Sequence, residues 1–295
     1  KDYNTNRYII VNNWKDSEVN SNSNHRGLIP RLWSSEHAAN YMDFTRPLDF
    51  KISNEYQNQE TIIERVNSFR LREQEGELSG EDYNDFFRTL GPYLDISKPS
   101  LFDNLNFLFT YQINYMYWRY FMWNFVGKQN DIQGDYSNIY GNWLSGINFI
   151  DEIRLGNQSN LDDDQKNNKA RNTYFFLPFI LGIIGLLYSY NRDLKTFWTL
   201  LLLFLFTGLA LKFYLNERPF EPRERDYALV GSFYVFSIWI GFGMSSILNF
   251  FSKIKIKFLN YGLFVLCLIA VPVLMAFENW DDHDRSDRYT AQSIA

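Results

Sequence analysis

The segment Asn216–Asp226, which reads NERPFEPRERD, gathers charged side chains between two apolar runs. Its charged residues are Glu217, Arg218, Glu221, Arg223, Glu224, Arg225 and Asp226. Two prolines stiffen this turn. Arginines on a rigid turn at a membrane surface can bind a phosphate or pyrophosphate through paired, charge-assisted hydrogen bonds. We therefore interpret Arg218, Arg223 and Arg225 as phosphate ligands, with Glu221, Glu224 and Asp226 as orienting or catalytic acids. The alternative is a solvated loop whose charges neutralise each other.

A second charged segment, NWDDHDRSDR at residues 279–288, follows the last apolar run. Carboxylates with one imidazole are suitable ligands for Mg²⁺ or Mn²⁺. The metal candidates are Asp281, Asp282 and Asp284, and Asp282 and His283 are second-rank catalytic candidates. The alternative is an acidic turn with Trp280 as an anchor at the membrane surface.

The loop GKQNDIQGDYSNIYGNW, residues 127–143, combines amides, acids and an indole. Sugar-binding sites use such groups for hydrogen bonding and stacking, but so do ordinary turns. The candidate sugar ligands are Asn130, Asp131, Asp135 and Trp143.

Apolar residues are concentrated in the second half of the chain, although the mean hydropathy of −0.32 is that of a soluble protein. The four apolar runs are Tyr174–Tyr190, Thr196–Leu215, Ala228–Phe251 and Phe258–Phe277. Their lengths are close to the about 20 residues that a membrane-spanning helix needs. We therefore predict a mainly helical, polytopic membrane bundle with four spans, and Lys212 near the end of the second run should extend to the interface. Buried core helices of a soluble protein are the alternative.

The first 172 residues carry charge throughout and are predicted to lie outside the membrane. A helix is expected over Gln59–Glu75, where Ile62, Val66 and Phe69 recur at helical spacing. Ser79 and Asp82 resemble a capping box that opens a second helix, which Gly91-Pro92 ends.

Leu101–Val126 is aromatic and nearly uncharged. We expect an interfacial helix, or one packed against the bundle, although a fifth span is the alternative. The predicted domains are residues 1–100 (polar region), 101–172 (aromatic helix and structured loop), 173–278 (membrane domain) and 279–295 (tail).

Charge in the short links predicts orientation, because cytoplasmic links are rich in Lys and Arg. Arg192 and Lys195 lie in one link, and SKIKIK (residues 252–257) forms another. Both are therefore expected on the cytoplasmic side, with the polar half and both charged segments outside. The net charge of −5 and pI near 5.3 exclude a nucleic-acid binder, which needs a basic face. The single cysteine, Cys267, rules out an internal disulfide framework, and the start at Lys1 suggests a piece of a longer chain.

Several long strings resemble a family of multi-spanning inner-membrane proteins of Bacteroidota. They are YQINYMYWRYFMWNFVGKQNDIQGD (111–135), GNWLSGINFIDEIRLG (141–156), KNNKARNTYFFLPFILGIIGLLY (166–188), FEPRERDYALVGSFYVFSIWIG (220–241) and NWDDHDRSDRYTA (279–291). The family is labelled as of unknown function and is grouped with the C-type, protein-O-mannosyltransferase-like glycosyltransferases. The resemblance covers residues 101–295 and is thin before them.

The resemblance implies a glycosyltransferase segment that moves a sugar from a polyprenyl-phosphate donor to a protein or glycan acceptor on the periplasmic face. In C-type enzymes the base or metal-binding acid usually lies in the first extracytoplasmic loop, upstream of this chain. Whether the catalytic base lies within these 295 residues is therefore open, and a C-terminal region of the relatives would also be missing. The alternative function is that of a non-enzymatic membrane scaffold or transport-complex subunit.

Overall fold

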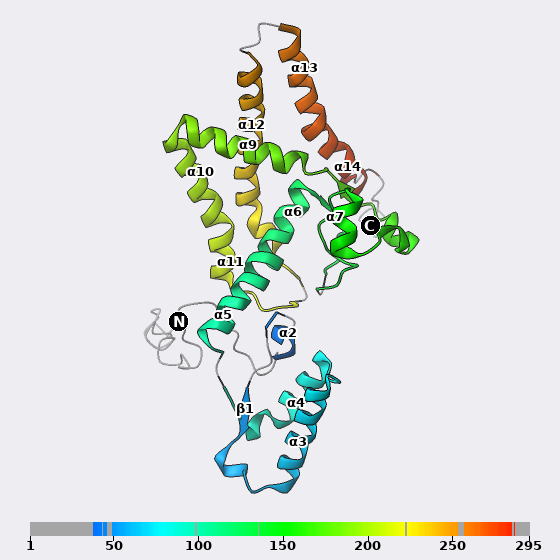
Figure 1. The fold of residues 1–295 in the computed structure, drawn as a ribbon, viewed down its shortest axis with the longest axis vertical. Coiled ribbons are helices and arrows are strands. Elements are labelled where there is room, and N and C mark those ends of the chain that lie inside the picture. The colour runs from blue at the N-terminus through cyan, green and yellow to red at the C-terminus, as the bar shows by residue number, and fades with distance from the viewer. Residues whose placement is uncertain are drawn as a thin grey trace, which may run out of the picture. The chain divides into compact units, whose positions relative to one another are not determined.

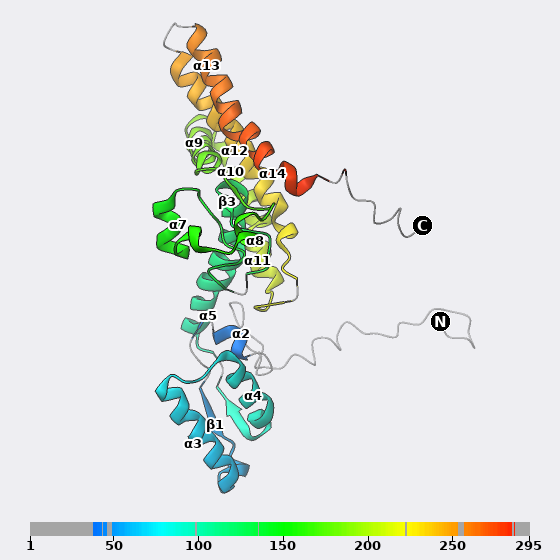
Figure 2. The same ribbon diagram turned by 90° about the vertical axis from the view of Figure 1, so that its right-hand side faces the viewer.

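The chain folds into two compact units, Lys1–Phe109 (unit 1) and Thr110–Ala295 (unit 2), each drawn in Figures 1 and 2. The structure is a computed structural model that describes residues 38–42, 44–45, 49–97, 99–134, 136–221, 223–252, 257–284 and 286. Most of residues 1–56, which the sequence predicts to be loops and short extended pieces, lie outside the described residues.

Unit 1 contains two main helices and a small antiparallel sheet. Its elements are α2 (Ala38–Met42), β1 (Phe50–Ile52), η3 (Asn54–Tyr56), α3 (Glu60–Glu75), α4 (Gly80–Leu90), η4 (Gly91–Tyr93), β2 (Leu94–Ile96) and α5 (Leu101–Phe107). The register of the sheet pairs Phe50 with Ile96 and Ile52 with Leu94.

The two helices predicted in this unit are confirmed. The buried residues of α3 are Ile62, Val66 and Phe69, the three that recur at helical spacing. The capping box at the start of α4 is formed, because Ser79 Oγ accepts from the Asp82 amide while the Asp82 carboxylate accepts from the Ser79 amide. Phe69 stacks on Phe86 at a centroid distance of 3.7 Å, which joins the two helices in one aromatic core.

The aromatic segment 101–126 continues from α5 into a π-helical stretch, η5 (Leu108–Trp118), and then α6 (Arg119–Phe125). Its exposed positions Phe109, Asn114 and Trp118 are five and four residues apart. This spacing fits the wider π-helical turn better than the 3.6-residue α-helical turn. Residues 117–126 pack in one core with Leu229, Phe236 and Trp239, so packing against the helical bundle is confirmed for this part of the segment.

Between α6 and the apolar helices lies a structured loop region that a two-residue antiparallel pairing closes. Its elements are β3 (Gly127–Lys128), α7 (Asn148–Leu155), η6 (Gln158–Asn160), α8 (Asp163–Lys166) and β4 (Asn172–Thr173). Gly127 pairs with Thr173 and Lys128 with Asn172. Gly127 has a φ of 136°, and a Cβ atom there would lie 2.5 Å from the carbonyl oxygens of Asn172 and Leu144.

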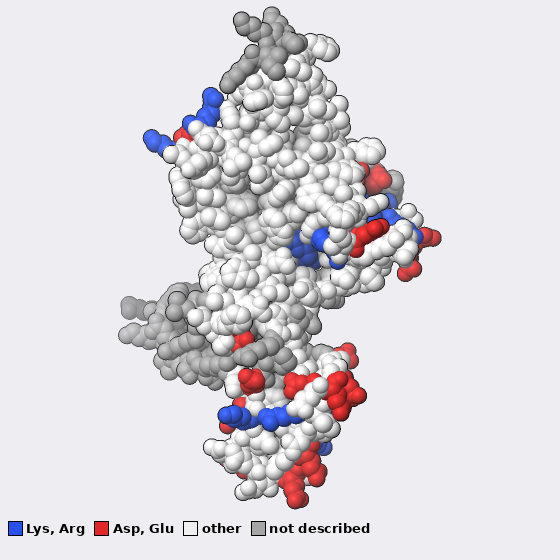
Figure 3. Space-filling view, in the orientation of Figure 1, with Lys and Arg blue, Asp and Glu red and all other residues white. Residues whose placement is uncertain are grey.

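The remaining helices are apolar and follow one another through short links. They are α9 (Leu177–Arg192), α10 (Leu194–Thr207), α11 (Leu209–Leu215), η7 (Asp226–Leu229), α12 (Val230–Ser252), α13 (Lys257–Leu268), the π-helical η8 (Ile269–Val273) and α14 (Leu274–His283). The face of these helices seen in Figure 3 shows hardly any charged side chains.

Within the part of the chain that the structure describes, three continuous helical stretches are long and apolar enough to cross a membrane, Leu194–Leu215, Asp226–Ser252 and Phe258–His283. They correspond to the second, third and fourth predicted spans. The first predicted span forms α9, whose 16 residues fall short of the about 20 residues that cross a bilayer. The four-span arrangement therefore stays a prediction.

Helix α9 crosses α12 in direct backbone contact (Figures 1 and 2). A Cβ atom at Gly185 would lie 1.7 Å from the carbonyl oxygen of Trp239, and one at Gly243 would lie 2.0 Å from that of Leu181. Small residues allow such close approach between apolar helices. The crossing therefore requires glycine on both helices.

Candidate functional site

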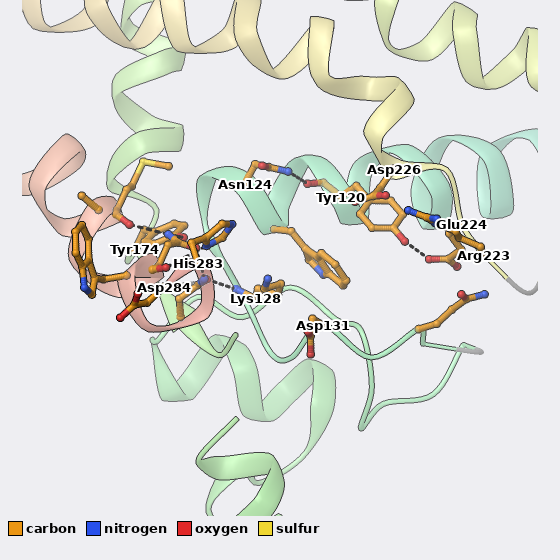
Figure 4. Close-up of a pocket in the computed structure, with 17 residues that line it drawn as sticks. Tyr120, Asn124, Lys128, Asp131, Tyr174, Arg223, Glu224, Asp226, His283 and Asp284 are labelled. Carbon is orange, nitrogen blue, oxygen red and sulfur yellow. Dashed lines mark hydrogen bonds between the residues drawn. The ribbon is translucent and has the colours of Figure 1, made fainter. Parts of the chain in front are cut away.

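A cavity of about 970 Å³ lies within unit 2, on the side of the polar loops (Figure 4). It is lined by Tyr120, Trp123, Asn124, Lys128, Asp131, Gln133, Asn172, Tyr174, Arg223, Glu224, Asp226, Met275, Ala276, Asn279, Trp280, His283 and Asp284. These residues come from α6, from β3 and the loop after it, from β4 and the residue after it, from the segment 216–226, and from α14 and the residue after it. The lining therefore combines aromatic rings, amides and charges of both signs.

The charged loop and the tail, both expected outside the membrane, face this one cavity. Arg223, Glu224 and Asp226 lie on one side, and His283 and Asp284 lie on the other. The two segments meet because α12 and α13 form an antiparallel pair and return the chain to the same end (Figure 1). Lys128 lies between the two sides in Figure 4, and sequence reasoning had not singled it out.

Arg119 holds the loop in place from inside the aromatic helix. Its side chain is only 5% exposed, and its Nη2 atom lies 2.6 Å from Glu224 Oε2. Its Nη1 atom donates to the carbonyl oxygen of Gly141 at 2.8 Å, and its Nε atom donates to that of Tyr115 at 3.0 Å. Tyr120 also donates to the Glu224 carboxylate. Arg119 thus fastens two loops that line the cavity, 127–143 and 216–226.

The guanidinium of Arg119 also lies over aromatic rings, 4.0 Å from the Tyr115 centroid and 4.5 Å from that of Tyr120. The close approach of loop 127–143 to this group requires glycine at position 141, where φ is 64° and a Cβ atom would lie 3.0 Å from Arg119 Nη1. The only sign of this arrangement in the sequence is Arg119 itself, the one charged residue in the aromatic stretch 111–126.

The predicted phosphate ligands differ in position. Arg223 lines the cavity and forms no hydrogen bond or ion pair with any residue that the structure describes. Arg225 does not line the cavity. Its guanidinium lies 3.5 Å from Glu221 Oε2 and 3.9 Å from Glu217 Oε1. Arg225 therefore acts within the loop in this arrangement, and of the two only Arg223 lines the cavity.

Lys212 lies in α11, just before this loop, and Arg218 lies near the start of the loop. The main-chain carbonyl of Arg218 accepts a hydrogen bond from Tyr111 at 3.0 Å. Lys212 was expected to extend to the interface, and this expectation is wrong because its side chain is 3% exposed. Its Nζ atom lies 2.5 Å from Glu217 Oε2, so a buried acid five residues away keeps the ammonium inside the fold.

Two carboxylates of the cavity have no partner within the described residues, Asp131 and Asp226. Glu224, in contrast, is held by Arg119 and Tyr120 and has a side chain that is 7% exposed. The Glu224 carboxylate is thus already occupied by two donors of the protein. Asp131 and Asp226 are therefore the better candidates for a base, and Glu224 is an orienting group.

The tail aspartates do not share one centre. Asp282 lies 3.6 Å from Lys128 Nζ. Hydrogen bonds from the side chain and the amide of Ser286 lower the pKa of Asp284. Within the described parts of the chain, no three His, Cys, Asp or Glu side chains are grouped closely enough to hold a metal ion. Successive residues of α14 project in directions about 100° apart, so the Mg²⁺ or Mn²⁺ site predicted at Asp281, Asp282 and Asp284 is not assembled.

His283 lies at the end of α14 and lines the cavity. Its Nδ1 atom is 3.0 Å from the carbonyl oxygen of Asn279 and 3.8 Å from Asp282. Asn279 in turn donates to Tyr174 Oη at 2.6 Å. Burial raises the pKa of Tyr174 to about 12, so this phenol stays protonated at neutral pH. The end of α14 is thus fixed to Tyr174 and to Asn172 and Thr173 of β4 by hydrogen bonds, and to β3 by the ion pair of Asp282 with Lys128.

The predicted sugar ligands also separate. Asn130 is fully buried, and its side chain bonds to the backbone of Ile139 and Gly141, so it holds the loop together and does not line the cavity. Trp143 packs on Phe176 outside the cavity. Asp131 does line it, whereas Asp135 lies outside the described residues.

Comparison with known proteins gives one match. The sequence model of a family of unknown function, DUF8416, matches residues 1–109. This match ends at Phe109, where the first compact unit also ends. No curated protein and no solved structure matches the chain.

Proposed function

We propose that unit 2 is a segment of an inner-membrane glycosyltransferase of the C-type. It transfers a sugar from a polyprenyl-phosphate donor to a protein or glycan acceptor on the extracytoplasmic side. The observation that carries the proposal is the cavity where the polar loops meet the apolar helices. There an arginine and two carboxylates that have no ionic partner among the described residues lie among aromatic rings and amides. Aromatic rings and amides suit a sugar, and the arginine suits its phosphate.

The residues have distinct roles in this proposal. The acceptor hydroxyl loses its proton to Asp226 or Asp131 and attacks the anomeric carbon. The bond between that carbon and the phosphate oxygen breaks, and the lipid phosphate leaves with the bonding electrons. Arg223 neutralises the charge that develops on the leaving phosphate. Glu224, fixed by Arg119, positions the loop that carries Arg223.

The membrane arrangement belongs to the same proposal. Helix α9 would serve as a fourth, short span, and the links at 191–195 and 252–257 would face the cytoplasm because they carry Arg192 and the lysines. The cavity would then face the extracytoplasmic space.

A non-enzymatic scaffold or transport subunit is the second candidate. One observation favours it, since unit 1 has a hydrophobic core of its own and an acid-rich surface that could bind a partner protein. Binding of a lipid phosphate in the cavity is expected of the enzyme and not of the scaffold.

The test uses the whole chain in nanodiscs, with a short-chain polyprenyl phosphate as the probe and the uncharged polyprenol as its control. Arg223→Lys should weaken binding of the phosphate by about ten- to a hundredfold, because one charge-assisted bond is worth about 1.5–3 kcal/mol. The matched control is Arg225→Lys, which changes an arginine of the same loop outside the cavity and should bind like the unchanged chain. Equal binding of the phosphate and the polyprenol would refute the proposal. In a transfer assay, loss of turnover in Asp226→Asn or Asp131→Asn would identify the base.

A further inference from the structure

Helix α7 (Asn148–Leu155) directs two large apolar side chains outward and one carboxylate inward, although Glu152 is also exposed and Ile150 is half-buried. Phe149 and Ile153, four residues apart and so on one face, are 75% and 71% exposed. Asp151 is buried with 3% exposure. A surface helix normally directs its apolar stripe to the core and its charges to solvent. The outward face of α7 therefore needs an apolar environment that unit 2 does not itself provide.

This arrangement is stable because the inward charges are bonded. The Asp151 carboxylate accepts from the amides of Ser145 and Gly146 at 2.9 and 2.8 Å. The Arg154 guanidinium lies 3.3 Å from the ring centroid of Trp143 and donates to the carbonyl oxygen of that residue. Burial lowers the pKa of Arg154 to about 10, so the group remains charged at neutral pH. These bonds prevent α7 from turning its apolar face inward.

The turn before α7 is fixed to the start of the apolar helices. The amide of Phe175 donates to the carbonyl oxygen of Ser145 at 3.1 Å. Gly146 has a φ of 82°, and a Cβ atom there would lie 2.8 Å from Cε1 of Phe175. The position of α7 is thus set by residues two places before α9 begins (Figure 1).

Exposed apolar side chains continue from this junction along α9. Phe175, Leu177 and Ile180 are 47%, 39% and 51% exposed. Helix α9 lies across α12, which belongs to a stretch long and apolar enough to span a membrane. The turn that precedes α7 therefore adjoins the exposed apolar start of α9, a kind of surface that lipid covers in a membrane protein.

We propose that α7 is a membrane-surface helix whose Phe149 and Ile153 side chains enter the lipid bilayer beside the start of α9. Such helices bury their apolar side chains on the order of 5–10 Å deep, at the boundary of headgroups and acyl chains. The occupant of the face is lipid, because the apolar surface that the turn before α7 adjoins belongs to the membrane helices. This inference concerns the loop region and does not depend on what the cavity binds.

The experiment places an environment-sensitive dye on single cysteines in a Cys267→Ser background, with the whole chain in nanodiscs. The labelled variants are Phe149→Cys and Ile153→Cys, and the matched control is Asn160→Cys, an exposed polar position of the same loop region. Spin labels attached to lipids near the headgroup should quench the dye at 149 and 153 several-fold more than at 160. Without the dye, the cysteines at positions 149 and 153 should react with a water-soluble thiol reagent several-fold more slowly than the cysteine at position 160.

Two results would overturn the proposal. Quenching and thiol reactivity at 149 and 153 that equal those at 160 would place the face in water. Protection that occurs only in nanodiscs holding two copies of the chain would assign the face to a second copy. The milder variant Phe149→Ser keeps α7 formed and can be combined with Ile153→Cys. Unchanged folding of this double variant, together with a faster reaction of its cysteine with the thiol reagent than in Ile153→Cys alone, would support the lipid contact.

Discussion

The contact between Arg119 and Glu224 should be the strongest single determinant of the shape of the cavity. Glu224→Gln removes the negative charge and keeps the size of the side chain. The atoms Nη2 and Oε2 are 2.6 Å apart, and the side chains are 5% and 7% exposed. Two unit charges at this distance attract by about 6 kcal/mol at an effective dielectric constant of about 20. Desolvation offsets part of this attraction, and removing one partner of a buried pair costs about 3–5 kcal/mol.

We expect about 3 kcal/mol for Glu224→Gln, at the lower end of that range, because the amide oxygen can still accept from Arg119 and Tyr120. The measurement is the free energy of unfolding from a denaturing-detergent titration in mixed micelles. Hydrogen exchange of residues 127–143 and 217–226 should increase at the same time, since Arg119 also bonds to Gly141.

The control is Glu221→Gln, which removes an acid of the same loop whose partner Arg225 is 46% exposed. Exposed pairs contribute about 0–1 kcal/mol, so this variant should unfold like the unchanged chain. A loss below about 1 kcal/mol for Glu224→Gln would mean that the pair behaves as an exposed one, and the reasoning from burial would be refuted. Restoration of stability when Arg119→Met is added would confirm that the cost arises from an uncompensated buried charge.

Three further predictions follow from other contacts. Gly185→Ala should disrupt the α9–α12 crossing and lower the thermal stability of the chain. Gly241→Ala should not, because its added methyl group meets nothing within 4 Å. Equal melting temperatures of the two variants would contradict the backbone contact. The pKa of Asp82 is lowered to about 2 by its bonds to Ser79 and Arg72, so its stabilisation of α4 is complete above its ordinary pKa of 3.8 and is lost as the pH falls toward 2. The rate of pepsin cleavage in α4, divided by the rate for an unstructured peptide at the same pH, should therefore rise more from pH 4 to pH 2 in the unchanged chain than in Asp82→Asn. The same pH dependence of this ratio in both chains would contradict the prediction. In the Cys267→Ser background, a membrane-impermeant thiol reagent should label Asp281→Cys and not Ser252→Cys in intact cells. Labelling of both would contradict the proposed topology, and labelling of Ser252→Cys alone would reverse it.

The sequence by itself determined the local elements of this protein. Helical spacing in α3, the capping box of α4 and three of the apolar runs depend on neighbours within a few positions of the chain. Such short-range patterns are written directly in the order of residues. The meeting of the charged loop with the tail was also predictable, because antiparallel helices return the chain to the same end.

Only the tertiary structure decided how each charge is used. Arg119 and Glu224 are 105 positions apart, and Lys128 and Asp282 are farther still, so no spacing rule connects them. Lys212 could extend to the membrane surface by its position, but a buried Glu217 offered a partner at 2.5 Å. Arg223 and Arg225 are equivalent in sequence, and the bend of the loop directs one to the cavity and the other to acids of its own turn. The physical reason is that the pairing energy of a charge depends on its burial and distance to partners, which packing alone sets.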